Sequence, residues 1–143
     1  MQTVTRRRWK PFAILVAAVG LYWLAMFAAT HLPLQTTPKG DPYSLDKLEH
    51  VAAFSILSVL LCGMGFAIGI PHRLLYLGVL GVITAYGAID EVSQSLVRDR
   101  TPDVLDWLAD IAGAVLGIVA FVAIRRIYVS RQTRRTSSTV TAT

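Results

Sequence analysis

The stretch RTPDVLDWLADIAGAVLG, at positions 100–117, decides how this sequence folds, because its polar and small residues repeat with the period of a helix. Alternating spacings of three and four residues place a set of them on one helical face: Asp103, Asp106, Asp110, Gly113 and Gly117. The apolar run continues to Ile124, and about 20 such residues suffice to cross ~30 Å of hydrocarbon. We therefore predict a membrane-spanning helix over 104–124, in which a row of carboxylates leads into a glycine groove.

Three further apolar runs of spanning length precede this one, and together they explain why 54% of the 143 residues are apolar. The predicted spans cover 11–30, 48–70, 74–93 and 104–124. We expect an all-α polytopic membrane protein, a four-transmembrane-helix bundle that forms one domain over 11–129. A basic tail, 1–10, precedes the bundle, and a basic tail rich in Ser and Thr, 130–143, is expected to be disordered.

Basic residues are distributed unevenly between the predicted connections. With four spans, one side of the membrane carries both tails and the 71–73 turn, which hold ten basic residues and no acidic one. The other side carries four basic residues and all nine acidic ones. Because cytoplasmic loops carry the excess of Lys and Arg, both termini are predicted to be cytoplasmic. The net charge of +5 does not indicate nucleic-acid binding, since these bases flank membrane spans and form no soluble basic face.

Polar residues collect at the outer ends of the last three predicted helices. Asp46 and His50 lie one turn apart at the start of the second helix, and Glu91 and Gln94 close the third. Asp110 lies about 10 Å into the fourth helix, where a carboxylate costs roughly 2.5–3.5 kcal/mol and needs a partner. We predict one outward-facing polar pocket with these members: Asp46, Lys47, His50, Glu91, Gln94, Arg100, Asp103, Asp106 and Asp110.

Two interpretations of these polar residues stay open. They can satisfy one another and only fix how the helices pack, with Gly113 and Gly117 allowing close contact. They can also form a functional site, because ionisable groups in a membrane are expensive and paired ions add little stability over apolar packing. Asp103 fits the first interpretation, since a helix start stabilises a carboxylate, and His31 is interpreted as an interfacial residue. A metal site would need converging ligands, for which Asp46, His50, Glu91 and Asp106 are available. No ligand spacing such as His-Glu-x-x-His supports one, and we expect no metal and no cofactor.

Three blocks of the sequence resemble the VanZ-like family of bacterial integral membrane proteins. They are DKLEH at 46–50, EVSQ at 91–94 and the stretch at 100–117, in the order and spacing that the family has. The resemblance maps the family's motif residues onto Asp46, Lys47, His50, Glu91, Gln94, Arg100, Asp103, Asp106, Gly113 and Gly117. One departure is Asp110, where the family often has Asn, so this chain carries an additional acid at depth.

The family takes its name from a member associated with resistance to the glycopeptide antibiotic teicoplanin. The resemblance therefore implies a protein of the bacterial cytoplasmic (inner) membrane, with a role in the cell envelope or in teicoplanin-type resistance. Its expected partners are membrane lipids and a lipid-linked precursor, a cell-wall precursor or a partner membrane protein.

Two classes of function stay open from the residues. The first is a binding or modulating protein whose pocket recognises an envelope component. The second is an intramembrane enzyme acting on a lipid or lipid-linked headgroup, with Glu91 or Asp106 as general base beside His50. A transporter is disfavoured, because four helices leave little room for alternating access.

Overall fold

The computed structural model describes residues 3–31, 45–96 and 102–140, and the side chains over 12–31, 45–96 and 102–131. The described residues form four α-helices: α1 (Thr3–His31), α2 (Leu45–Ala67), α3 (His72–Gln94) and α4 (Val104–Val140). All four are long and apolar enough to cross a membrane. The all-α fold with four spanning helices, predicted from the sequence, is therefore confirmed.

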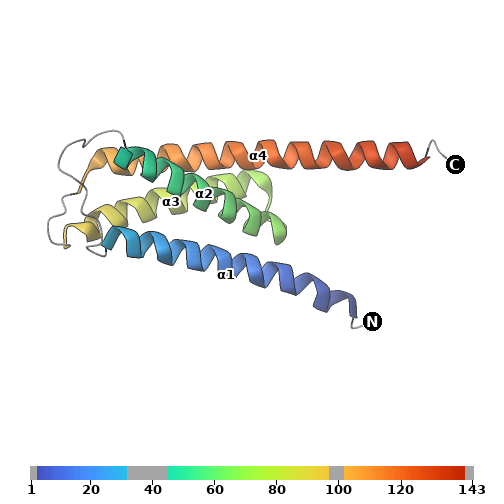
Figure 1. Cartoon of the computed structure of the whole chain (residues 1–143), viewed down its shortest axis with the longest axis horizontal. Helices are drawn as coiled ribbons and strands as arrows, with labels where there is room; N and C mark the ends of the chain where they lie inside the picture. The colour runs from blue at the N-terminus through green and yellow to red at the C-terminus, as the bar shows by residue number, and fades with distance from the viewer. Residues whose placement is uncertain (1–2, 32–44, 97–101, 141–143) are drawn as a thin grey trace.

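The helices run alternately in opposite directions (Figure 1). Both chain ends and the α2–α3 turn lie at one end of the bundle. At the other end, α1 and α3 finish at His31 and Gln94, and α2 and α4 begin at Leu45 and Val104. We call this second end the polar end, because the described residues of the predicted polar pocket lie near the helix termini there.

The fourth helix is longer than the predicted span. It continues past Ile124 to Val140, so the structure has helix over 130–140, a part of the tail for which the sequence predicted disorder. The physical reason is the absence of a helix breaker, since no Gly or Pro follows Gly117 within α4.

The turn between α2 and α3 has the hydrogen bonding of a glycine-terminated helix. Gly69 has φ +81°, a left-handed conformation that glycine adopts without strain. The Ile70 amide donates to the Gly65 carbonyl at 3.0 Å, and the Gly69 amide donates to the Phe66 carbonyl at 3.1 Å. Pro71 then stands directly before α3, where its missing amide hydrogen costs nothing.

The contact between α2 and α4 is close along the middle of the bundle. A Cβ atom at Gly113 would lie 2.6 Å from the Val51 carbonyl oxygen, and one at Gly117 would overlap the carbonyl oxygen of Ser55. The hydroxyl of Ser55 donates to the Gly113 carbonyl at 3.0 Å, and that of Ser58 donates to the Ala114 carbonyl at 2.9 Å. Small residues thus bring the two backbones together, as in other membrane bundles.

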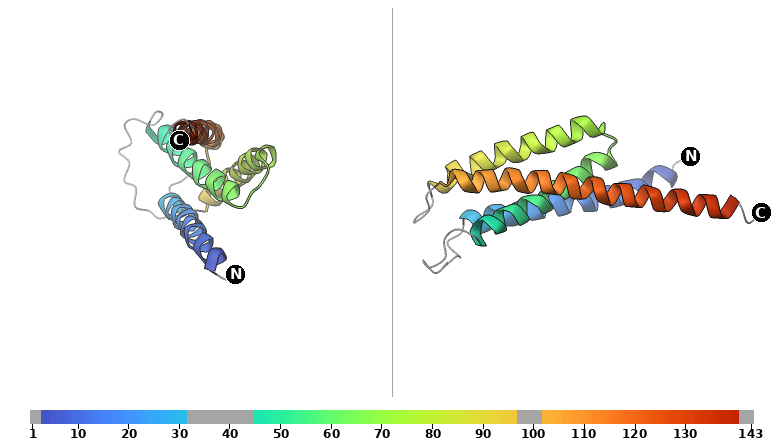
Figure 2. Two further views of the ribbon diagram at one scale, coloured as in Figure 1. Left: turned by 90° about the vertical axis from the view of Figure 1, so that its right-hand side faces the viewer. Right: turned by 90° about the horizontal axis from the view of Figure 1, so that it is seen from above.

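The apolar core lies between these helices and the face of α3. Leu57, Cys62, Ile83 and Ala114 are fully buried there. The end-on view shows α2 beside α4, with α1 and α3 on further sides of α2 (Figure 2). Helix α1 reaches this core through Tyr22, whose hydroxyl donates to the Ala53 carbonyl of α2 at 2.9 Å. The helices therefore arrive at the polar end already packed.

Candidate functional site

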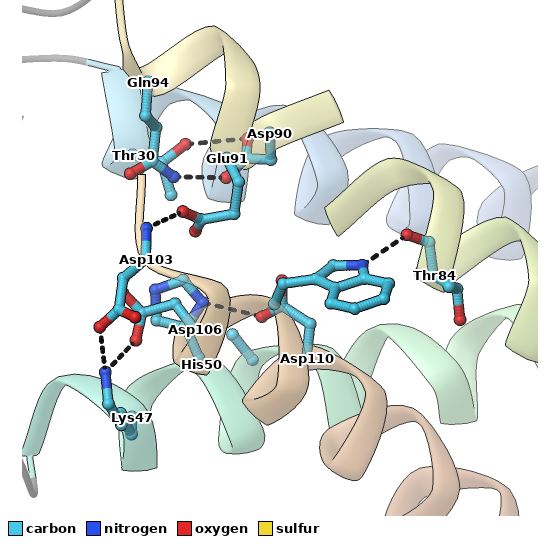
Figure 3. A network of polar contacts seen from close by, with 12 residues as sticks. Thr30, Lys47, His50, Thr84, Asp90, Glu91, Gln94, Asp103, Asp106 and Asp110 are labelled. Carbon is cyan, nitrogen blue, oxygen red and sulfur yellow. Dashed lines mark hydrogen bonds and ion pairs between the residues drawn. The ribbon is translucent and has the colours of Figure 1, made fainter. Parts of the chain in front are cut away.

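Five ionisable or amide side chains are buried at the polar end of the bundle, which is unusual for residues of these types. They come from the last turns of α3 and the first turns of α4 (Figure 3): Asp90, Glu91, Gln94, Asp106 and Asp110. Such groups need partners in a medium of low dielectric constant. The contacts divide them into two networks.

The first network begins with Lys47, on the first turn of α2. Its ammonium donates to Asp103 at 2.8 Å and to Asp106 at 2.6 Å, so one cation holds two carboxylates at the start of α4. The backbone amide of Asp103 donates to Glu91 of α3 at 2.7 Å. Three helices are therefore tied together at this point.

Asp103 lies immediately before α4 and also caps that helix, because its carboxylate accepts the amide hydrogen of Leu105 at 2.8 Å. The hydrogen bond from Lys47, followed by the one from the Leu105 amide, holds the pKa of the Asp103 carboxyl below its ordinary value. This carboxylate is therefore kept ionised at the boundary of the bundle.

The deepest carboxylate, Asp110, is paired with His50 of α2. Their Nδ1 and Oδ1 atoms are 2.7 Å apart, and Asp110 is only 1% exposed. Gly87 of α3 makes room for this pair, since a Cβ there would lie 2.7 Å from Oδ2 of Asp110. Trp107 lies in the same region, where it donates its indole hydrogen to the Thr84 carbonyl at 3.0 Å. With Asp110 ionised, Nδ1 of His50 carries the hydrogen and Nε2 is left to accept one.

The second network joins α1 to α3. Asp90, 3% exposed, accepts hydrogen bonds from Gln94 at 2.7 Å and from Thr30 at 3.3 Å. Nε2 of His31 lies 2.8 Å from the hydroxyl of Ser93. His31, interpreted from the sequence as an interfacial residue, thus takes part in a contact between helices.

The structure brings most of the predicted pocket together. Lys47, Glu91, Asp103 and Asp106 are joined by hydrogen bonds, and the His50–Asp110 pair lies next to them, so that we count all six in the first network. Asp46 is exposed beside them, and Gln94 belongs to the second network. Arg100, and Arg98 near it, lie outside the described residues. Asp90 and Thr30 were not predicted, although the spacing of four residues between Asp90 and Gln94 could have indicated their contact.

Comparison with known proteins identifies the family of this chain. The family model described as VanZ/LLP1 matches residues 4–125. This range covers α1 from its second residue, all of α2 and α3, and α4 up to residue 125. The chain belongs to the VanZ/LLP1 family. No curated protein and no solved structure matches it. It is thus a VanZ/LLP1 membrane protein with four apolar helices, and the resemblance predicted from its motifs is confirmed.

The VanZ/LLP1 chain also has a cavity at its polar end, between α1 and α2. Its volume is about 90 Å³, and it is open to the outside of the bundle. Helix α1 contributes Met26 and Thr30, and α2 contributes Asp46, Glu49, His50, Ala53 and Phe54. The cavity therefore connects the first network, through His50, to the outside of the bundle. Glu49 was not among the predicted site residues.

A metal could be held in this VanZ/LLP1 protein by a histidine and two carboxylates. Asp46, His50 and Asp106 each offer a ligand atom, and the three atoms lie within 4.8 Å of one another. The chemistry of the set suits a divalent cation. However, the ammonium of Lys47, 2.6 Å from Asp106, already compensates one of these carboxylates. The expectation of no metal stays a prediction.

Proposed function

We propose that this protein binds the polar headgroup of an envelope lipid, or of a lipid-linked cell-wall precursor, at the polar end of its bundle. The observation that carries the proposal is the pairing of His50 with the buried Asp110 at the wall of an open cavity. A polar group that entered the cavity would meet the imidazole of His50, whose orientation is already fixed by Asp110. Fixed polar groups beside an apolar wall are typical of binding sites for small ligands.

The contacts of the first network favour this function over a packing role alone. Ion pairs withdrawn from water add little net stability compared with apolar side chains of the same volume. Lys47 and His50 are nevertheless used to hold three aspartates, while α2 and α4 are already joined by their small residues. Charges that the scaffold does not need are the expected mark of a site.

The location of the site follows from the charge distribution of the sequence. We place the protein in the bacterial cytoplasmic membrane with both termini in the cytoplasm, so that the polar end faces outward. A reporter fused after Ser130 should then be cytoplasmic, and a reporter inserted at Thr37 should be in the outer compartment. A cytoplasmic reporter at Thr37 would show that the site faces inward and has no access to outer-leaflet headgroups.

Lipid binding by the purified protein tests the proposal. The wild-type protein should retain lipids that native mass spectrometry resolves, and His50→Gln should lose them while it stays folded. Ser58→Ala is the matched control, because it removes one buried hydrogen bond of α2 at a residue that does not line the cavity and costs about 1 kcal/mol. Equal lipid retention by both variants would contradict a headgroup site at His50.

An envelope role is tested in cells. We expect a strain deleted for this gene to become more sensitive to teicoplanin, or to another antibiotic that acts on the envelope, and the His50→Gln gene should not restore resistance. Restoration to the wild-type level by His50→Gln would separate any resistance from this site.

A second function, that of an intramembrane enzyme, is favoured by the same pair. An imidazole that is paired through Nδ1 with a buried carboxylate at the wall of a cavity has the orientation that a general base needs. In that case the purified protein should convert headgroups of added lipids over time. A binding protein would leave the same lipids unchanged, so mass analysis of the lipid before and after incubation distinguishes the two.

A further inference from the structure

Two carboxylates at the mouth of the cavity take no part in the hydrogen bonds and ion pairs of the two networks, although Asp46 lies within 4.8 Å of ligand atoms of His50 and Asp106. Asp46 and Glu49 lie three residues apart on α2, and both line the cavity beside His50. Within the described part of the chain, neither has a hydrogen-bond or salt-bridge partner. Asp46 lies in the first turn of α2, where the helix dipole stabilises its ionised carboxylate. That effect fades by Glu49.

The charges around the cavity are not balanced by the described cations. Lys47 holds Asp103 and Asp106, and His50 holds Asp110. The two carboxylates at the mouth therefore add negative charge next to a wall that is mostly apolar, with Met26, Ala53 and Phe54. A phosphate entering alone would meet like charge there, whereas a cation would meet complementary charge.

We propose that this cavity receives the ammonium group of a membrane lipid headgroup, with the carboxylates of Asp46 and Glu49 as its counter-ions. The inference rests on the proposed headgroup site and names the ligand chemistry at its mouth. A primary ammonium has three donors, enough for both carboxylates and one further acceptor in the cavity. Hydrogen bonds between ionised groups are among the strong ones.

The apolar part of the cavity fits the remainder of such a ligand. Phe54 and Met26 lie deeper between α1 and α2 than the carboxylates, on the side toward the middle of the bundle. A lipid lying along the α1–α2 groove would place its headgroup at the carboxylates and its first apolar carbons against these side chains.

Titration of the full-length, delipidated protein with two lipids tests the inference. The lipids are phosphatidylethanolamine and phosphatidylglycerol with identical acyl chains, and native mass spectrometry measures the bound fraction. We expect phosphatidylethanolamine to bind about tenfold more tightly, which is the effect of one good charge-assisted contact. Asp46→Asn and Glu49→Gln, which keep size and remove charge, should each reduce this preference, and the double variant should abolish it.

Binding of phosphatidylglycerol is the internal control for folding. It should be unchanged or stronger in the double variant, because two negative charges have been removed. Equal affinity of the wild-type protein for both lipids would overturn the ammonium inference and leave the proposed headgroup site standing. Absence of binding for both lipids would overturn the inference together with the proposed function.

A separate experiment tests whether these carboxylates bind a metal ion instead of an ammonium group. Zn²⁺ alone is titrated into the lipid-free protein, and the lipid titration is repeated with a chelator. We expect the preference for phosphatidylethanolamine to persist with the chelator. If Zn²⁺ binds, Asp46→Asn abolishes that binding and the chelator removes the lipid preference, the carboxylates serve a metal and the inference is wrong.

Discussion

Helices α2 and α4 meet in two different ways along their length. In the middle of the bundle, Gly113 and Gly117 bring the backbones together, and serine hydroxyls of α2 donate to carbonyls of α4. At the polar end, Lys47 and His50 of α2 hold aspartates on or next to the first turns of α4. The first contact uses small, neutral groups, whereas the second uses charged ones.

The fold requires only the contact in the middle of the bundle. Close backbone packing with neutral hydrogen bonds is how membrane helices associate in general, and it needs no ion pair. Charged groups at the polar end carry a desolvation cost that apolar side chains would avoid. We therefore assign stability to the middle contact and ligand binding to the polar end.

The largest expected effect comes from breaking the middle contact. Gly117→Ala would place a Cβ against the Ser55 carbonyl and 2.6 Å from Cβ of Ser58, so α2 and α4 must separate. We expect the free energy of unfolding to fall by about 3 kcal/mol, measured by denaturation in detergent. Gly78→Ala is the control, because nothing lies within 4 Å of its Cβ, and the gain in helix propensity should raise stability by up to ~1 kcal/mol. Equal effects at both positions would show that the middle contact is not close.

A smaller effect is expected at the polar end. His50→Leu leaves the carboxylate of Asp110 buried without its partner and should cost about 2 kcal/mol of unfolding free energy. Adding Asp110→Leu, which has the same branching at Cγ, should restore stability to within ~1 kcal/mol of wild type. Lipid binding should be lost in the single and in the double variant alike. Recovery of binding together with stability would return this pair to a packing role.

The smallest effect is expected from the exposed part of the first network. The pKa of Asp103 is lowered by Lys47 and by the Leu105 amide, so ionised Asp103 favours the folded state. That contribution is present above the ordinary pKa of 3.8 and is lost as the pH falls through the lower folded value. This contribution is measured by denaturing the wild type and Asp103→Asn at pH values from about 6 to about 3, a range that spans the titration of an Asp carboxyl. The wild-type advantage should shrink toward acid pH, and a constant difference would contradict the pairing.

Much of this fold follows from the sequence because its determining features are local. The spacing of Asp103, Asp106 and Asp110 puts them on one face of one helix, and length with hydropathy identifies each span. The insertion cost of Asp110 also predicted that it must have a partner. Each of these features lies within a single helix and can be recognised without knowing how the helices pack.

Which partner each residue takes could not be predicted in the same way. Helical spacing fixes a face but not the axial register between two helices, so it could not tell which polar residue at the outer helix ends pairs with Asp110. The register is set by where Gly113 and Gly117 fit against α2. Glu49 was missed for a related reason, since only the packing of α1 beside α2 creates the cavity that it lines.

Asp106→Asn provides the most direct test of the claim that the polar end binds a ligand. The amide keeps the size of the side chain and an oxygen that can accept from Lys47, and Asp103 still holds that ammonium. Lipid binding and the amount of folded protein are measured on the same membrane preparation, with Glu91→Gln as a second variant of the same kind. We expect folded protein at the wild-type level or above, with lipid binding reduced by about tenfold or more. A loss of binding that only follows a loss of folded protein would contradict it.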